Sequence, residues 1–167
     1  MAAGKNRNRN IGLEMLVIFV SVVGLVLLLY LVMILSFQDG DRSASETMSI
    51  AVRISRIIYE NPTEDEVKAI GLMLRYVAHL LLFFVVGLVT TFVSMVIFRR
   101  YYRIFGVILS AGICYLLAYY TEYYKQFVEG RHFQMTDVAL NWLGSAAGIA
   151  CMVLSYFMNR LLVKMSS

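Results

Sequence analysis

Polar residues that could do acid–base or anion-binding chemistry occur in pairs at the edges of otherwise apolar segments. Each pair has the spacing i, i+4, and the pairs are Arg75 with His79, Glu122 with Gln126, and Asp137 with Asn141. This spacing places both members of a pair on one face of a helix. Ionisable residues at the edge of an apolar span are costly and usually functional. His79 with Glu122 or Asp137 is therefore the candidate catalytic acid–base pair.

The same region offers groups that could bind a substrate. The candidate binding residues are Arg75, Arg131, Asn141 and Gln126. Arginine makes bidentate contacts with phosphate or carboxylate groups, and side-chain amides add hydrogen bonds. His132 is interpreted as a loop histidine at a wet surface and is left out of this set.

A structural interpretation of the same residues is an electrostatic clasp. In a clasp, Arg75 or Arg131 would pair with Glu122 or Asp137 and hold the helices together. The residues alone do not decide between a pocket and a clasp, nor between binding and catalysis.

The sequence predicts no metal site and no cofactor. Two histidines with scattered carboxylates lack compact ligand spacing such as H-E-x-x-H. A Gly-rich phosphate loop and a nucleophile elbow are also missing. Cys114 and Cys151 both lie inside apolar runs, and we interpret them as small buried hydrophobes.

The composition is that of a membrane protein. Hydrophobic residues make up 60% of the 167 residues and charged residues only 16%, whereas a soluble domain carries more charge. The formal net charge is +4, but the cations flank apolar runs and form no continuous face. Membrane lipids are therefore the expected partners, and nucleic acid is not.

Four apolar segments are long enough to cross a hydrocarbon core of about 30 Å. They cover about 12–37, 72–98, 104–120 and 138–163. The first follows a basic N-terminus but is too long for a typical signal peptide, so it is interpreted as an uncleaved anchor. We predict an all-α fold, an integral membrane four-helix bundle that forms a single domain over residues 1–167.

The distribution of charge predicts that both termini are cytoplasmic. Eight of the 15 cations lie at the two ends and in the short turn at 99–103, namely Lys5, Arg7, Arg9, Arg99, Arg100, Arg103, Arg160 and Lys164. Those segments carry only Glu14 as an acid. Short segments rich in Lys and Arg stay inside, so the segments at about 38–71 and 121–136 are expected outside.

The first outer segment is expected to contain an amphipathic helix at the membrane surface. Ile50, Ile54, Ile57 and Ile58 recur at helical spacing. A second helix is expected to start after Thr63, the predicted N-cap of a capping box, and to continue into the second span.

One face of the fourth span carries small and polar residues at offsets 0, 4, 7, 8 and 11. These are Asp137, Asn141, Gly144, Ser145 and Gly148. Small residues at this spacing allow another helix to approach closely, so this face is predicted to point into the bundle.

Together, these residues resemble the VanZ-like family of small bacterial envelope proteins, named for a teicoplanin-resistance protein. One motif corresponds to Arg75, Ala78, His79 and Gly87. A second, more specific motif corresponds to Glu122, Phe127, Val128, Gly130, Arg131, Asp137, Asn141, Gly144 and Gly148. The resemblance covers about 35–148. The sequence departs from the family pattern at Tyr76, Leu82, Thr121 and Lys125, where the family often has Lys, Glu, Asp and Gln.

The resemblance implies a multi-pass protein of the bacterial cytoplasmic membrane with a role in tolerance of glycopeptides such as teicoplanin. Combined with the polar residues, it predicts an outward-facing pocket that binds or acts on an envelope lipid, a lipid-linked glycan or a cell-wall precursor. The alternative is a non-enzymatic membrane scaffold. Transport is a third reading, in which four short spans would need self-association, so a homo-oligomer stays open.

Overall fold

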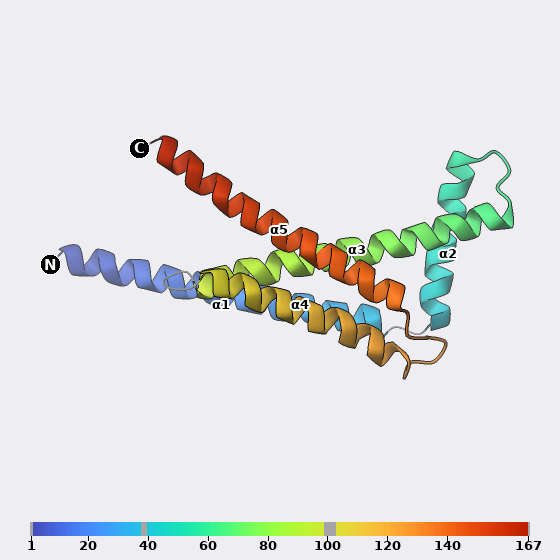
Figure 1. Cartoon of the computed structure of the whole chain (residues 1–167), viewed down its shortest axis with the longest axis horizontal. Coiled ribbons are helices and arrows are strands. Elements are labelled where there is room, and N and C mark those ends of the chain that lie inside the picture. The colour runs from blue at the N-terminus through green and yellow to red at the C-terminus, as the bar shows by residue number, and fades with distance from the viewer. Residues whose placement is uncertain (1, 38–39, 99–102, 167) are drawn as a thin grey trace.

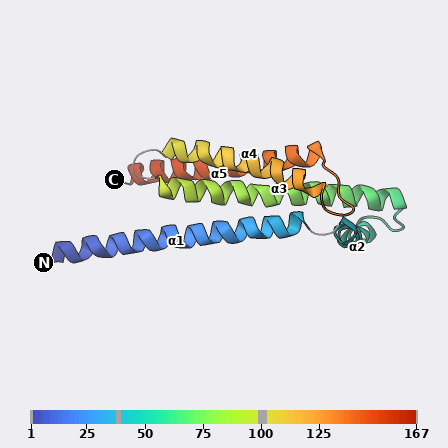
Figure 2. The same ribbon diagram turned by 90° about the horizontal axis from the view of Figure 1, so that it is seen from below.

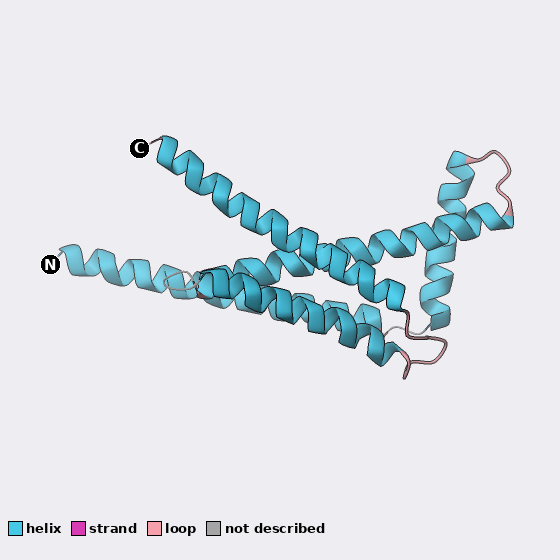
Figure 3. Ribbon diagram, viewed as in Figure 1, coloured by secondary structure: helices cyan, strands magenta, loops and turns pink. Residues whose placement is uncertain are grey.

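The structure, a computed structural model, describes residues 2–37, 40–98 and 103–166. Within these ranges every regular element is an α-helix (Figure 3). The helices are α1 (Ala2–Ser36), α2 (Gly40–Ile58), α3 (Glu64–Ile97), α4 (Arg103–Lys125) and α5 (Met135–Met165). Four of them, α1 from Glu14 onward and α3 to α5 in full, are long and apolar enough to span a membrane. The predicted all-α membrane fold is confirmed.

Helix α3 is the central element, because it contacts each of the other four helices. Figures 1 and 2 show α3, α4 and α5 lying together, α1 running along one side, and α2 crossing near one end. Both termini lie at the opposite end (Figure 1), as an even number of spans requires. Which end is cytoplasmic stays a prediction, and residues 99–102 of the basic turn lie outside the described residues.

Glycines make the closest helix contact, between α3 and α5. A Cβ atom at Gly144 would lie 2.3 Å from the Leu80 carbonyl oxygen, and one at Gly148 would lie 2.1 Å from that of Phe84. The five small and polar residues of this α5 face are all buried. The predicted inward orientation of this face is therefore confirmed, and it brings Asp137 and Asn141 against α3.

Helix boundaries extend beyond the apolar runs. Helix α3 begins at Glu64 because Thr63 forms the predicted capping box, in which its hydroxyl accepts from the Glu66 N–H and the Glu66 carboxylate accepts from the Thr63 N–H. Helix α4 continues to Lys125, past the predicted end near Tyr120. Hydropathy detects the apolar part of a helix, whereas the helix itself ends where its backbone hydrogen bonds stop.

Helix α2 is amphipathic, as predicted. It packs near α3 through Ala51 and Ser55, both 0% exposed, and the Ala51 methyl lies 3.7 Å from the Cβ position of Gly71. Its exposed apolar side chains include Ile50, Ile57 and Ile58. Contact of these isoleucines with the membrane surface stays a prediction.

The two cysteines differ in environment. Cys114 is buried in the core with Val32, Phe83, Val86 and Ala118, as expected. Cys151 is exposed on α5, so its predicted burial was wrong. In the same apolar run Gly148 is buried and Ile149 packs against the core, so an apolar run alone does not place each of its side chains in the interior.

Candidate functional site

The candidate site lies at the end of the bundle near α2, where three helices bring their polar residues to one level. Helix α3 supplies Arg75 and His79, one turn apart near the start of its apolar part. The last turn of α4 supplies Glu122, and the first turns of α5 supply Asp137 and Asn141. Because α4 is antiparallel to both α3 and α5, its C-terminal end meets the N-terminal ends of the other two.

Asp137 and Arg75 form an ion pair between α5 and α3. The Arg75 guanidinium donates to Asp137 Oδ2. The Asp137 side chain is 0% exposed, whereas that of Arg75 is 36% exposed. Charge-assisted hydrogen bonds of this kind are among the stronger ones in proteins. The pair thus anchors a fully buried carboxylate with a cation that still reaches the surface.

The orientation of His79 follows from its hydrogen bonds. Asn141 Nδ2 donates to Glu122 Oε1 at 3.4 Å, which directs the Asn141 carbonyl oxygen toward His79. This oxygen accepts from His79 Nδ1 at 2.8 Å, so Nδ1 carries a proton. The other ring nitrogen, Nε2, lies 3.5 Å from Asp137 Oδ2. In the neutral imidazole, Nε2 is therefore the atom with a free lone pair.

A second ion pair joins Lys125 to Glu122 within α4. The Lys125 ammonium donates to Glu122 Oε1, and their side chains are 2% and 1% exposed. Lys125 was noted in the sequence only as a departure from a family pattern. Its spacing of three residues from Glu122 was the available signal, since such residues are neighbours on a helix.

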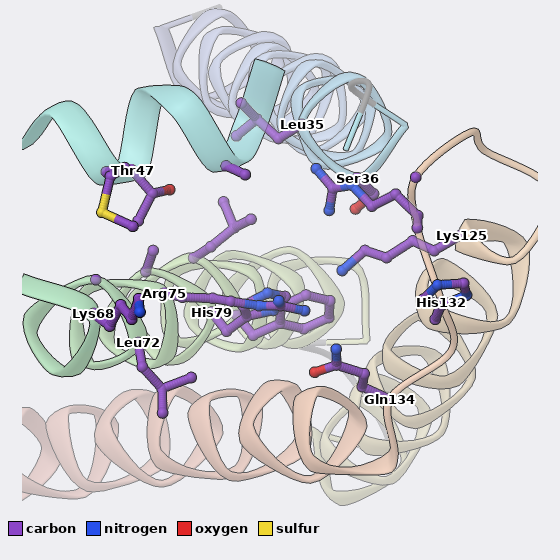
Figure 4. A pocket seen from close by; sticks show the side chains of 18 residues that line it. Leu35, Ser36, Thr47, Lys68, Leu72, Arg75, His79, Lys125, His132 and Gln134 are labelled. Carbon is purple, nitrogen blue, oxygen red and sulfur yellow. The ribbon is translucent and has the colours of Figure 1, made fainter. Parts of the chain in front are cut away.

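A cavity of about 580 Å³ opens beside these pairs. It lies between the end of α1, α2, the N-terminal half of α3 and the loop between α4 and α5, as Figure 4 shows. Its basic lining residues are Lys68, Arg75, His79, Lys125, Arg131 and His132. Its larger apolar lining residues are Leu35, Met48, Leu72, Leu82 and Phe83. The lining of the cavity therefore combines several basic side chains with apolar ones.

The loop after α4 contributes to this cavity through a tight turn. Gly130 has φ 70°, a conformation that suits glycine because other residues meet a steric penalty there. The Arg131 N–H then bonds back to the Val128 carbonyl at 3.1 Å. This turn places Arg131 and His132 along the cavity.

The structure brings most of the sequence-predicted site residues together. Arg75, His79, Glu122, Asp137 and Asn141 form one connected set of contacts. Arg131 lines the same cavity, and so does His132, which the sequence had left out. Gln126 is exposed and does not line the cavity, because α4 ends at Lys125 and the chain turns away there. None of the roles assigned to these residues is tested by the geometry alone.

The two candidate catalytic carboxylates lie behind the cations. Neither Glu122 nor Asp137 lines the cavity, whereas Lys125, Arg75 and His79 all do. Of the candidate catalytic residues, His79 is thus the one that can meet a ligand directly. One oxygen of each carboxylate, Glu122 Oε2 and Asp137 Oδ1, is buried without a hydrogen-bond partner among the described residues.

The charges of the site favour an anion over a metal ion. Ligand atoms of His79, Glu122 and Asp137 lie within 4.8 Å of one another, close enough to hold a cation. However, Lys125 and Arg75 already neutralise the two carboxylates. A divalent ion would therefore add two unbalanced charges to a region shielded from water, which is costly. The same two cations line the cavity, and this lining suits a negatively charged ligand.

Comparison with known proteins identifies one match. The VanZ/LLP1 family model matches residues 21–157, which include the C-terminal part of α1, all of α2, α3 and α4, and α5 through most of its length. Every residue of the connected polar set lies inside the matched region. No curated protein and no solved structure matches the chain.

Proposed function

Because the chain belongs to the VanZ/LLP1 family, we propose that it is a protein of the bacterial cytoplasmic membrane whose pocket faces outward. The pocket binds or acts on an envelope lipid or lipid-linked glycan. Through that ligand, the protein contributes to tolerance of glycopeptides such as teicoplanin, in keeping with the family name. The termini are on the cytoplasmic side in this proposal, as the distribution of Lys and Arg predicts.

The observation that carries this proposal is the mixed lining of the cavity. Arg75, His79 and Lys125 supply polar groups to the lining, while Leu35, Leu82 and Phe83 supply apolar ones. A ligand that complements both kinds of side chain has a polar group and a hydrocarbon part, as membrane lipids do. Small-molecule sites commonly combine apolar walls with a few placed polar groups.

If the site is catalytic, His79 is its acid–base group. Its side chain lines the cavity, its Nδ1 proton is held by Asn141, and Nε2 lies 3.5 Å from Asp137 Oδ2. A fixed ring with one free nitrogen can accept a proton from a bound hydroxyl or water. Glu122 and Asp137 then act by holding Lys125, Arg75 and His79 in place rather than by touching the ligand.

The scaffold alternative is favoured by a different observation, the two buried ion pairs. Arg75 with Asp137 joins α3 to α5, and Lys125 with Glu122 stiffens the end of α4. In this alternative the pairs clasp the bundle, and the family role is exerted through contacts with other membrane proteins. The two functions predict different effects for the loss of His79. His79 lines the cavity, so its loss should disrupt a ligand pocket. In its neutral form it makes no ion pair between helices, so its loss should leave a clasp intact.

The test is a comparison of glycopeptide susceptibility and protein stability for the same variants. His79→Ala is expected to leave the thermal stability of the purified protein close to wild type and to abolish the tolerance that overexpression confers. Met73→Ala on the same helix, where Met73 is 66% exposed, is the control and should keep both properties. Full tolerance in a stable His79→Ala variant would refute the pocket and leave the scaffold.

A further inference from the structure

Lys125 occupies an unusual position for a cation, because it is almost fully buried and yet lines the cavity. Its side chain is 2% exposed, yet it lines the cavity, and Figure 4 shows it extending from α4 toward the cavity interior. A buried ammonium normally needs full compensation by acceptors. Among the described residues, its hydrogen-bond acceptor is a single oxygen of Glu122. An ammonium has three donors, so donors remain for a ligand.

Arg75 presents the same arrangement from the opposite helix. One nitrogen of its guanidinium bonds Asp137, while the side chain lines the cavity and stays 36% exposed. A guanidinium has five N–H donors in a fixed fork. In both pairs the carboxylate lies on the side away from the cavity, so a ligand meets the positive partner first.

From this geometry we infer that the cavity selects a phosphate group with two negative charges, and that Lys125 is the residue that sets this preference. The inference rests on the proposed function and names its ligand more closely. A phosphate monoester carries a charge of about −1.5 to −2 near neutral pH and three acceptor oxygens. A phosphodiester carries a single charge and two free oxygens, which Arg75 alone would satisfy.

The apolar walls specify what the phosphate is attached to. Leu35, Met48 and Leu82 come from three different helices and border the same cavity as the cations. A hydrocarbon chain on the phosphate could lie along these side chains and continue into the surrounding bilayer. The ligand class is therefore a lipid with a terminal monophosphate or diphosphate. Free phosphate or diphosphate has the same charged group but gains nothing from the apolar walls.

The experiment uses the full chain in nanodiscs of neutral phosphatidylcholine. Two probes with identical acyl chains are compared, phosphatidic acid (a monoester) and phosphatidylglycerol (a diester), with inorganic phosphate and diphosphate as competitors. Wild-type protein is expected to bind phosphatidic acid about tenfold more tightly than phosphatidylglycerol, as one further hydrogen bond to a charged group allows. Inorganic diphosphate should compete only weakly. Competition by free diphosphate as strong as that by phosphatidic acid would overturn the lipid assignment.

The variants identify the residue responsible. Lys125→Gln alone would leave Glu122 unpaired and could unfold the protein, so the main test is the double variant Lys125→Gln with Glu122→Gln, which removes both charges. It is expected to lose about tenfold in affinity for phosphatidic acid and to bind phosphatidylglycerol as wild type does. Lys125→Arg should keep the preference. Arg56→Gln, which removes an exposed cation of α2, is the control and should behave as wild type.

The outcomes separate this inference from the proposed function. Equal binding of the two lipids by wild type, or an unchanged preference in the double variant, would overturn the role of Lys125 while leaving a lipid-binding pocket in place. Absence of binding to both lipids, compared with nanodiscs lacking protein, would overturn the inference and count against the proposed function as well.

Discussion

Asp137 on α5 is fully buried and bonded to Arg75 on α3, a residue 62 positions away in the sequence whose side chain remains partly exposed. This asymmetry makes the two residues unequal in their effect on stability. Loss of Asp137 leaves a guanidinium that can turn toward water. Loss of Arg75 leaves a buried carboxylate whose remaining basic neighbour at that oxygen, within the described part of the chain, is the His79 imidazole 3.5 Å away.

The first prediction is therefore that Arg75→Ala destabilises the protein more than Asp137→Asn does. Removing one partner of a fully buried pair typically costs about 3–5 kcal/mol. We expect roughly 2–3 kcal/mol for Arg75→Ala, discounted because the guanidinium is partly exposed. Asp137→Asn removes the charge that needs compensation and should cost about half as much. Reversible unfolding in detergent would measure both values.

A control for this comparison is present on the same helix. Lys68 pairs with Glu64 at 3.7 Å, and both side chains are mostly exposed. Such surface pairs contribute about 0–1 kcal/mol, so Lys68→Ala should change stability little. A larger loss for Asp137→Asn than for Arg75→Ala would mean that the carboxylate has partners other than Arg75 that matter more.

The second prediction concerns the close contact of α3 and α5. Gly148→Ala is expected to destabilise the protein by about 1–3 kcal/mol, because overpacking a close contact forces neighbouring atoms to shift. Its added methyl would meet the backbone of Phe84, which cannot rotate away. Because His79 and Asn141 face each other across the same two helices, the variant should also weaken ligand binding. Thermal unfolding and the lipid-binding assay measure these two effects.

Gly112 is the matched control for Gly148. It lies on α4, and a Cβ atom there would meet nothing within 4 Å. Gly112→Ala should be neutral or stabilising by about 1 kcal/mol, since alanine favours the helix over glycine. If Gly148→Ala changed stability no more than Gly112→Ala does, the result would contradict the close packing of α3 against α5.

The sequence was sufficient for the helices and for the convergence of the site, because both depend on periodicity. Helical spacing placed Asp137, Asn141 and Gly148 on one face, and alternating directions brought that face to the level of His79. The capping box at Thr63 also followed from residue types alone. These features are set by local spacing, which is visible in a single sequence.

Two features of the site could not be predicted in this way. Lys125 was overlooked because hydropathy placed the end of its span near Tyr120, while α4 continues through several polar residues. The recessed position of Glu122 and Asp137 depends on how far each helix has rotated against its neighbours. Periodicity says which residues share a face but not which of them ends up nearest a cavity, since that is decided by packing.

The third prediction tests the orientation in the membrane. In a background with Cys114 and Cys151 replaced by serine, single cysteines are introduced at Ser45, Gln134 and Ser166, all exposed. A membrane-impermeant thiol reagent added to intact cells should label the first two and spare the third, because Lys and Arg concentrate at the termini and in the 99–103 turn. Lysed cells should label all three. The reverse pattern in intact cells would place the cavity on the cytoplasmic side and remove the basis for an outward-facing pocket.

The last prediction distinguishes the roles of His79 and Asn141. Their side chains are hydrogen-bonded at 2.8 Å but differ in burial. His79 borders the cavity with its side chain 17% exposed, whereas Asn141 is 0% exposed and also donates to Glu122. His79→Ala leaves one carbonyl oxygen that water in the cavity can reach, so a loss below about 1 kcal/mol is expected. Asn141→Ala leaves His79 Nδ1 without its acceptor in a buried position and removes one of the two donors to Glu122 Oε1, so it should cost about 1–3 kcal/mol. Asn141→Asp, which keeps the shape of the side chain but adds a carboxylate next to Glu122, should destabilise the protein more than Asn141→Ala, because like charges repel most strongly where water is excluded.

Thermal unfolding of the three variants in one detergent gives their order of stability directly. Glycopeptide susceptibility of strains that express the same variants tells whether tolerance follows stability or follows the presence of His79. Loss of tolerance in the stable His79→Ala variant would separate function from stability, as a ligand pocket requires. Tolerance that declines in step with stability across all three variants would instead favour the clasp.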